Sequence, residues 1–185
     1  MEKQVKDNAE KRMKKTVQAL LGEFNTIRTG RASAALFEKI MVEYYGQQTP
    51  LNQVATISIP EARLVVIQPW DKNVLAEIEK AIQKSELSLN PSNDGKIIRI
   101  NIPPLTEERR KELVKLAKNK TEQNRVAIRN IRRDANEELK KLQKNSTISE
   151  DDAKRGMDDI QKLTDKYIEE LNGLLEKKEN EILEV

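Results

Sequence analysis

The feature that most constrains the fold is the distribution of proline along the chain. All 6 prolines lie between Pro50 and Pro104, so residues 1–49 and 105–185 contain none. Proline breaks helix interiors, and its absence therefore permits long helices in both outer stretches. The sequence predicts two outer helical parts and a central part of a different kind.

Three segments outside the proline-containing region carry apolar residues at helical spacing. They recur every three or four positions over 2–29, over 107–144, and from Ser149 to Ile182, as on one face of a helix. Ser149 is a candidate N-cap of the third segment, with Asp152 near the capping-box position. Each apolar stripe needs a partner for burial, so we expect the three helices to form one long bundle.

The central part is predicted to be a small α/β domain. Four stretches are rich in β-branched residues or alternate between apolar and polar ones, as strands do: 40–46, 54–59, 63–70 and 96–103. Residues 71–87 have helical spacing and begin with the candidate cap Asp71. Residues 89–95 have the composition of a turn. The predicted fold is therefore α+β with two domains, in which 1–30 and 106–185 form the bundle and 31–105 form the inserted domain.

Two short segments join the predicted domains, near residues 29–33 and 103–108. Gly30 relaxes the first, whereas two adjacent prolines make the second extended before Thr106 begins a helix. Two thin connections between compact domains favour a hinge, with a fixed elbow as the alternative. The predicted hinge residues are Thr29, Gly30, Pro103, Pro104 and Leu105.

Composition excludes several kinds of functional site. The chain has no cysteine and no histidine, which removes thiolate chemistry and the commonest general base and metal ligand. Its glycines are too far apart for a GxxxxGK[ST] loop or a GxGxxG turn. Adjacent carboxylates such as Asp151 and Asp152 lie in helical sequence, where a solvated face explains them. We therefore expect no catalytic residue, no metal site, no cofactor and no enzymatic activity.

The same composition predicts a cytoplasmic protein. The N-terminus is charged throughout and has no apolar segment typical of a signal peptide. No run of eighteen apolar residues occurs, so no membrane span is expected. The absence of cysteine suits a reducing compartment.

Charge is sorted along the sequence, and arginine is concentrated in one place. Residues 107–144 carry 13 basic and 7 acidic groups, whereas 145–185 carry 6 and 12. If Ile128 and Ile131 face the bundle core, Arg125, Arg129 and Arg132 form a row beside them, and Arg133 widens it outward. Every basic residue between 125 and 133 is arginine, although the chain has more lysine. The planar guanidinium suits contacts with phosphate.

Three interpretations of this row follow from the pattern. Its arginines could pair with acidic residues of the third helix and form an ordinary solvated face. They could bind an acidic protein, which would make the chain a cytosolic helical adaptor. They could also bind nucleic acid, together with a second basic group in RTGR at 28–31. Neither group has interleaved aromatic residues, so structured nucleic acid is favoured over single strands.

Seven motifs distributed over the whole chain resemble the bacterial ribosome recycling factor family. They are RTGRAS (28–33), VEYYG (42–46), LNP (89–91), PPLTEERRKEL (103–113), AIRNIRRDAN (127–136), ISEDDAKR (148–155) and QKLTD (161–165). The resemblance implies an L-shaped molecule whose three-helix bundle carries an inserted β/α/β sandwich. It also implies a monomer that binds the post-termination 70S ribosome at large-subunit (50S) rRNA.

The activity implied by the resemblance is ribosome recycling. With elongation factor G and GTP, the family splits the ribosome into subunits and frees mRNA and tRNA, and initiation factor 3 then helps to clear the small subunit. The rRNA-contacting residues implied by the matching motifs are Arg28, Arg31, Arg110, Arg129, Arg132 and Arg133. One departure is visible, because many members have proline where this chain has Ala34. That leaves open how stiff the first connection is.

Overall fold

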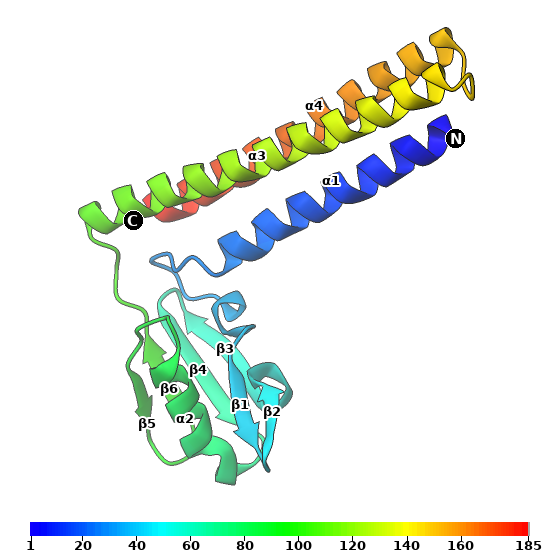
Figure 1. Cartoon of the computed structure of the whole chain (residues 1–185). Coiled ribbons are helices and arrows are strands. Elements are labelled where there is room, and N and C mark those ends of the chain that lie inside the picture. Colours follow the sequence, from blue (N-terminus) through cyan, green and yellow to red (C-terminus); the bar gives the residue numbers. More distant parts are fainter. Residues whose placement is uncertain (185) are drawn as a thin grey trace. The chain divides into compact units, whose positions relative to one another are not determined.

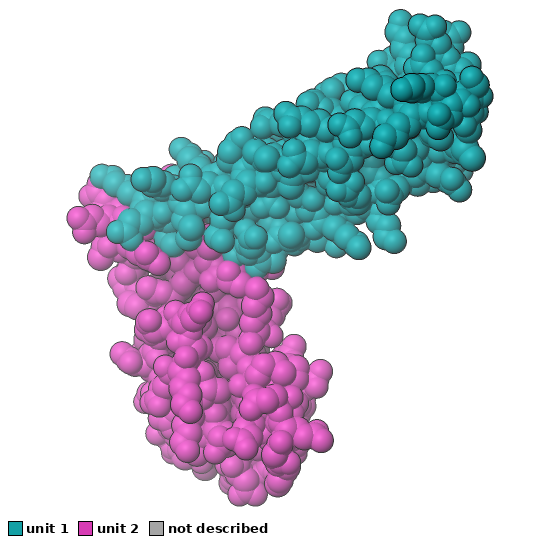
Figure 2. Space-filling model, viewed as in Figure 1, with its two compact units in different colours: residues 1–24, 111–180 teal, residues 25–110, 181–185 magenta. Residues whose placement is uncertain are grey.

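The computed structural model describes residues 1–184, which divide into two compact units (Figure 2). Unit 1 comprises Met1–Phe24 and Lys111–Asn180. Unit 2 comprises Asn25–Arg110 and the end of the chain from Glu181 on. The fold is α+β, with helices in unit 1 and a mixture of sheet and helix in unit 2, as the sequence predicted.

Unit 1 is a bundle of three long helices that lie side by side (Figure 1). They are α1 (Glu2–Asn25), α3 (Glu107–Lys144) and α4 (Glu150–Leu183). The buried faces follow the predicted apolar stripes, with Met13, Leu20, Ile128, Ile160 and Leu171 fully enclosed. The three-helix bundle is therefore confirmed, although α1 ends at Asn25 rather than near residue 29.

Side chains cap the two longest helices where the sequence predicted. The backbone N–H of Arg109 donates to Thr106 Oγ1 at 3.1 Å, just before α3. At α4, the N–H of Asp152 donates to Ser149 Oγ at 3.0 Å, and the N–H of Ser149 donates to the Asp152 carboxylate at 3.4 Å. This reciprocal pair is a capping box in which aspartate takes the place of glutamate.

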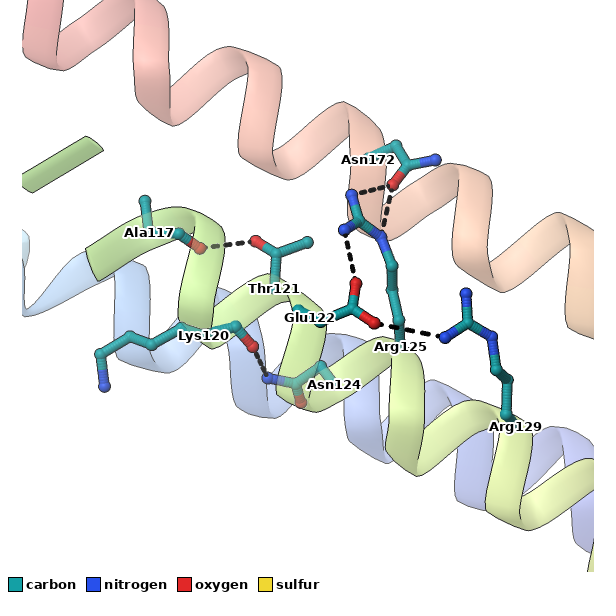
Figure 3. Close-up of polar contacts among 8 residues, drawn as sticks. All are labelled: Ala117, Lys120, Thr121, Glu122, Asn124, Arg125, Arg129 and Asn172. Carbon is teal, nitrogen blue, oxygen red and sulfur yellow. Dashed lines mark hydrogen bonds and ion pairs between the residues drawn. The ribbon is translucent and has the colours of Figure 1, made fainter. Parts of the chain in front are cut away.

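Polar residues inside the bundle bond to the backbone of their own helix. Thr121 and Thr164 are buried, and their hydroxyls donate to the carbonyls of Ala117 and Ile160, each at 2.8 Å. Asn124, half-buried, donates to the Lys120 carbonyl at 2.8 Å (Figure 3). These bonds satisfy the polar groups that interrupt the apolar faces of α3 and α4, because a buried polar group must find a partner.

Unit 2 contains two antiparallel sheets and one α-helix, α2 (Leu75–Lys84). The smaller sheet pairs β1 (Met41–Tyr44) with β2 (Gln47–Pro50). The larger has the order β3-β4-β6-β5, formed by Ala55–Glu61, Leu64–Pro69, Ile98–Asn101 and Pro91–Asn93. Short 3-10 helices occur at η1 (Ala34–Phe37), η2 (Leu51–Gln53) and η3 (Lys72–Val74).

The core of unit 2 lies between α2 and the sheets. Ile78 and Ile82 of α2 are fully buried, in one cluster with Val65, Ile67 and Ile100 of the larger sheet. The smaller sheet and the 3-10 helices add Val42, Leu51 and Phe37 to the same cluster. The predicted α/β domain is thus confirmed as a class, with a core of its own.

Two strands of unit 2 lay outside the predicted ones. β2 has the sequence QQTP, without apolar alternation, and it forms by pairing with β1. β5 lies in the predicted turn at 89–95 and is a three-residue edge strand beside β6. The helix predicted over 71–87 is shorter, because Asp71 caps η3 before α2 begins. Among residues 1–184, no helix has both the length and the apolar character needed to cross a membrane.

Candidate nucleic-acid interface

The phase of α3 fixes the position of its arginines. Ile128 and Ile131 are buried in the bundle, as predicted. Arg129 and Arg132 are consequently half-buried at the edge of the core, and Arg133 is exposed. Arg125, one turn before Arg129, is half-buried on the same side of the helix. We call these four residues the arginine row.

Arg125 is more enclosed than Arg129, with 22 % of its side chain exposed against 42 %. Its Nε and Nη2 both donate to Asn172 Oδ1 on α4, at 2.9 and 2.6 Å (Figure 3). Its Nη1 donates to Glu122 Oε2 at 3.0 Å. Three hydrogen bonds engage this guanidinium within the bundle, so Arg125 links α3 to α4 rather than facing a ligand.

Arg129 shares the carboxylate of Glu122 with Arg125. Its Nη1 lies 3.3 Å from Glu122 Oε1, while Arg125 occupies the other oxygen (Figure 3). Hydrogen bonds, from Arg125 first and then from Arg129, lower the pKa of Glu122. The carboxylate is therefore ionised at neutral pH, but one negative charge between two guanidinium groups leaves this part of the row positive.

Arg132 and Arg133 have little or no internal pairing. Arg132 Nη1 donates to the neutral amide oxygen of Gln161 on α4, at 3.4 Å. Arg133 is exposed and has no hydrogen-bond or ion-pair partner in the described part of the chain. Within that part, the residues of α4 that hydrogen-bond to the row are the amides Asn172 and Gln161, and no acidic residue of α4 forms an ion pair with it. The predicted pairing of the row with acidic residues of the third helix is therefore not observed among residues 1–184.

The basic group RTGR lies in unit 2, and both of its arginines have internal partners. Arg28 Nη1 donates to the carbonyl of Pro103 at 3.3 Å. Burial, and then the nearby charge of Arg109, lower the pKa of Arg28. Arg31 forms an ion pair with Glu184. Arg28 thus bonds the first connecting segment to the second.

Arg110, the sixth predicted residue, is half-buried in the first turn of α3. Its Nε is buried and has no hydrogen-bond partner among residues 1–184. A buried guanidinium nitrogen without an acceptor is uncommon. The six predicted arginines therefore form two groups: Arg129, Arg132 and Arg133 in unit 1, and Arg28, Arg31 and Arg110 in unit 2.

Three residues of this surface were missed by sequence reasoning: Glu122, Gln161 and Asn172. Glu122 has a sequence signal, because it precedes Arg125 by three positions, a spacing that brings side chains together on a helix. The two amides have none, since their meeting with the row depends on how α4 aligns with α3. In the described chain, no cluster of three or more acidic side chains is arranged to hold a metal ion.

A three-helix bundle with a basic row of arginines, joined to a small sheet domain, defines a class of protein that acts by binding through charge and shape. Comparison with known proteins identifies the family. The model of the family described as ribosome recycling factor matches residues 20–183, which include all six predicted arginines. This chain belongs to the ribosome recycling factor family. It is a translation factor and not an enzyme.

Relatives of known family support this assignment over the full length. The ribosome-recycling factor of Treponema denticola is 64% identical over 184 residues, and that of Syntrophomonas wolfei is 60% identical over 185 residues; both alignments cover 100% of each chain. A solution structure of a ribosome recycling factor matches with a TM-score of 0.84 at 50% identity, covering 100% of this chain and 98% of that one.

A second solved structure contains a family member with its partners. It combines models of the T. thermophilus ribosome recycling factor and the E. coli elongation factor G bound to the E. coli post-termination complex. This chain matches one chain of that structure with a TM-score of 0.70 and 50% identity. The match covers 99% of both chains.

Proposed function

We propose that this chain binds the post-termination 70S ribosome and, with elongation factor G and GTP, splits it into subunits, so that mRNA and tRNA are released. Membership of the family supports the proposal. A relative of 50% identity has been described together with elongation factor G on a post-termination complex. The chain contributes binding and geometry, and GTP hydrolysis by the elongation factor supplies the energy.

The ribosomal target that we propose for the arginine row is rRNA of the 50S subunit. The observation that carries this proposal is the weak internal pairing of Arg132 and Arg133. Arg132 has a single long hydrogen bond to a neutral amide, and Arg133 has no partner among the described residues. Both guanidinium groups can donate hydrogen bonds to a phosphate without first losing an ion pair. Such charge-assisted hydrogen bonds are strong.

The remaining arginines differ in how directly they can contact rRNA in this proposal. Arg129 reaches rRNA by exchanging one exposed contact with Glu122 for a phosphate. Arg28, Arg31 and Arg110 form a second contact group in unit 2, where the Nε of Arg110 lacks an acceptor. Arg125 is excluded, because its three internal hydrogen bonds hold it between the helices.

A hinge between the functional domains, 1–30 with 106–185 and 31–105, is the mechanical part of the proposal. Thr29, Gly30, Pro103, Pro104 and Leu105 are its residues. A Cβ at Gly30 would lie 3.9 Å from the Leu105 backbone N, so Gly30 of the first connecting segment lies beside Leu105 of the second. The Arg28 bond to the Pro103 carbonyl couples the two connecting segments, so that they move together.

The chain acts, in this proposal, as a cytoplasmic monomer. Its product is a separated small subunit, on which initiation factor 3 acts next. These assignments follow from the family and from the location of its target.

Splitting of purified post-termination ribosomes, followed on sucrose gradients, tests the function. Subunits are expected only when this chain, elongation factor G and GTP are all present. Arg132→Ala should weaken binding to 50S subunits, whereas Lys140→Ala, which removes an exposed charge elsewhere on α3, should not. With one phosphate contact for each of the six arginines, log K against log salt should have a slope of roughly −4 to −5. A slope near zero would contradict the phosphate contacts, and splitting without this chain would contradict the function.

A further inference from the structure

A shallow hollow lies on unit 2, and none of the predicted arginines lines it. Its volume is about 380 Å³, and it lies where η1, η2, β3 and the end of β4 meet. The residues that line it are Ala34, Phe37, Glu38, Asn52, Ala55, Thr56, Ile57 and Trp70. No part of the proposed contact with rRNA uses this surface.

The floor of the hollow is apolar. Phe37 and Ala55 are 1% and 2% exposed and belong to the core of unit 2, and Ile57 packs against the same core. An apolar floor at the surface favours a ligand with an aliphatic or aromatic part, because burial removes that surface from water.

The wall of the hollow is an exposed indole. Trp70 has 67% of its surface exposed, which is unusual for so large an aromatic residue. Its Nε1–H donates to Thr56 Oγ1 at 2.8 Å, so the ring is held in one orientation beside β3. A fixed and exposed aromatic face is a preorganised contact surface, and tryptophan is enriched among the residues that contribute most to protein interfaces.

Charge at the hollow is negative. Among the described residues that line it, Glu38 is the one that carries a charge, and it is exposed. Asp71 follows Trp70 and is fixed by two hydrogen bonds, from the Tyr45 hydroxyl at 2.6 Å and the Asn73 N–H at 2.9 Å. The Tyr45 bond, more than any other contact, keeps the pKa of Asp71 below its ordinary value, so this carboxylate is ionised. Nucleic acid is disfavoured here, because its phosphates would lie near Glu38.

We propose that this hollow binds an arginine side chain presented by a protein partner. The aliphatic part would lie on Phe37 and Ile57, the guanidinium would stack on the Trp70 ring, and Glu38 would accept its hydrogen bonds. Arginine is the preferred cation for such stacking, because its planar group combines a cation–π contact with directed donors. This is a protein-binding site in unit 2, formed by other residues than the arginine row and opposite to it in charge.

Titration with N-acetyl-arginine amide, followed by NMR, tests the site directly. Trp70 is the only tryptophan of the chain, so its indole N–H signal is unambiguous. A saturable shift is expected, with a dissociation constant on the order of 10 mM for one stacked and ion-paired side chain. N-acetyl-norleucine amide, which lacks the charge, and guanidinium chloride, which lacks the aliphatic part, should each produce smaller shifts without saturation.

Two matched substitutions locate the binding. Glu38→Gln should weaken the binding of N-acetyl-arginine amide about threefold, the size of an exposed ion pair. Glu86→Gln removes an exposed carboxylate of the same unit outside the hollow and should leave it unchanged. Equal affinity in Glu38→Gln and wild type, or no saturable shift, would overturn the proposal. A saturable indole shift with a single-stranded heptauridylate, and none with the arginine derivative, would overturn it in favour of nucleic acid.

Discussion

Arg132 on α3 donates to the neutral side chain of Gln161 on α4, with 3.4 Å between Nη1 and Oε1. Gln161 in turn donates from Nε2 to Asp165 Oδ1 at 2.9 Å. The carboxylate of Asp165 is thus connected to Arg132 through the amide of Gln161. A long bond to a neutral acceptor is weaker than an ion pair, so Arg132 keeps its charge available for a ligand.

Gln161→Glu is expected to weaken binding to 50S subunits. The new carboxylate would pair with Arg132 and neutralise it internally. An exposed ion pair contributes about 0.2–1 kcal/mol, which corresponds to a roughly 1.5- to 5-fold loss of affinity. Cosedimentation with 50S subunits at several salt concentrations measures this loss of affinity. Gln161→Ala, which removes the amide without adding charge, should bind as well as the wild type. Equal binding by Gln161→Glu would mean that Arg132 does not contact the subunit.

Glu122→Gln is expected to change affinity in the opposite direction. Removing the charge that Arg125 and Arg129 share frees Arg129 for phosphate, while Asn172 still holds Arg125. We expect binding to 50S subunits to tighten about two- to fivefold. The slope of log K against log salt should become more negative by about the amount that one additional phosphate contact contributes. Binding that weakens instead would show that Glu122 is needed to orient Arg129.

The positions of the arginines on α3 could be predicted from the sequence. The residues of α4 that hydrogen-bond to them could not. Apolar spacing alone gives the phase of α3, because Ile128 and Ile131 must face the core, and that phase determines where Arg129 and Arg132 lie. Gln161 and Asn172 meet the row because of the alignment of α4 along α3. That alignment depends on packing between two helices, which the periodicity of either helix does not contain.

A similar limit applies to the sheets of unit 2. β2 is polar and forms only because the chain reverses at Tyr45 and Gly46, whose φ angles of 48° and 82° are both positive. Two consecutive residues with positive φ suit a tight hairpin loop. The glycine after YY was a signal for this turn, but the polar strand that follows carries no apolar pattern of its own.

Tyr167 is expected to make the stability of the bundle fall at high pH. It is 2% exposed and donates to Glu10 Oε1 at 3.1 Å. Burial, and then the bond to Glu10, raise the pKa of Tyr167 to about 12. The folded state therefore retains the proton more strongly than an unfolded tyrosine, whose pKa is about 10. Stability contributed by this proton is present below pH 10 and is lost as pH rises toward 12.

Urea unfolding of the wild type and of Tyr167→Phe, at pH 8 and at pH 11, measures this effect. At pH 8 the variant should be less stable by about 0.5–1.5 kcal/mol, the usual contribution of one hydrogen bond. At pH 11 the difference should shrink or reverse, because phenylalanine has no proton to lose. Lysine deprotonation affects both proteins equally. An unchanged difference between the two pH values would contradict the role of the buried phenol.

Gly156 and Gly173 on α4 should respond in opposite ways to replacement by alanine. A Cβ at Gly156 would lie 3.0 Å from Leu139 Cδ1 and 3.1 Å from its Cδ2, and Leu139 is buried on α3. A Cβ at Gly173 would meet no atom of residues 1–184 within 4 Å. Alanine is the better helix former, so Gly173→Ala should stabilise by about 0.5–1 kcal/mol. At Gly156 the same gain is opposed by overpacking, which costs about 1–3 kcal/mol.

Gly156→Ala is therefore expected to lower the free energy of unfolding by roughly 1 kcal/mol, whereas Gly173→Ala raises it. Urea denaturation followed by circular dichroism compares both variants with the wild type. Equal dependence of the free energy of unfolding on urea concentration would show that the surface exposed on unfolding is unchanged. Because the two substitutions are chemically identical and lie on the same helix, propensity cancels and the difference between them reports the contact with Leu139. If both variants were stabilised equally, Leu139 would have moved aside without loss, and α4 would not require a small residue where it approaches α3.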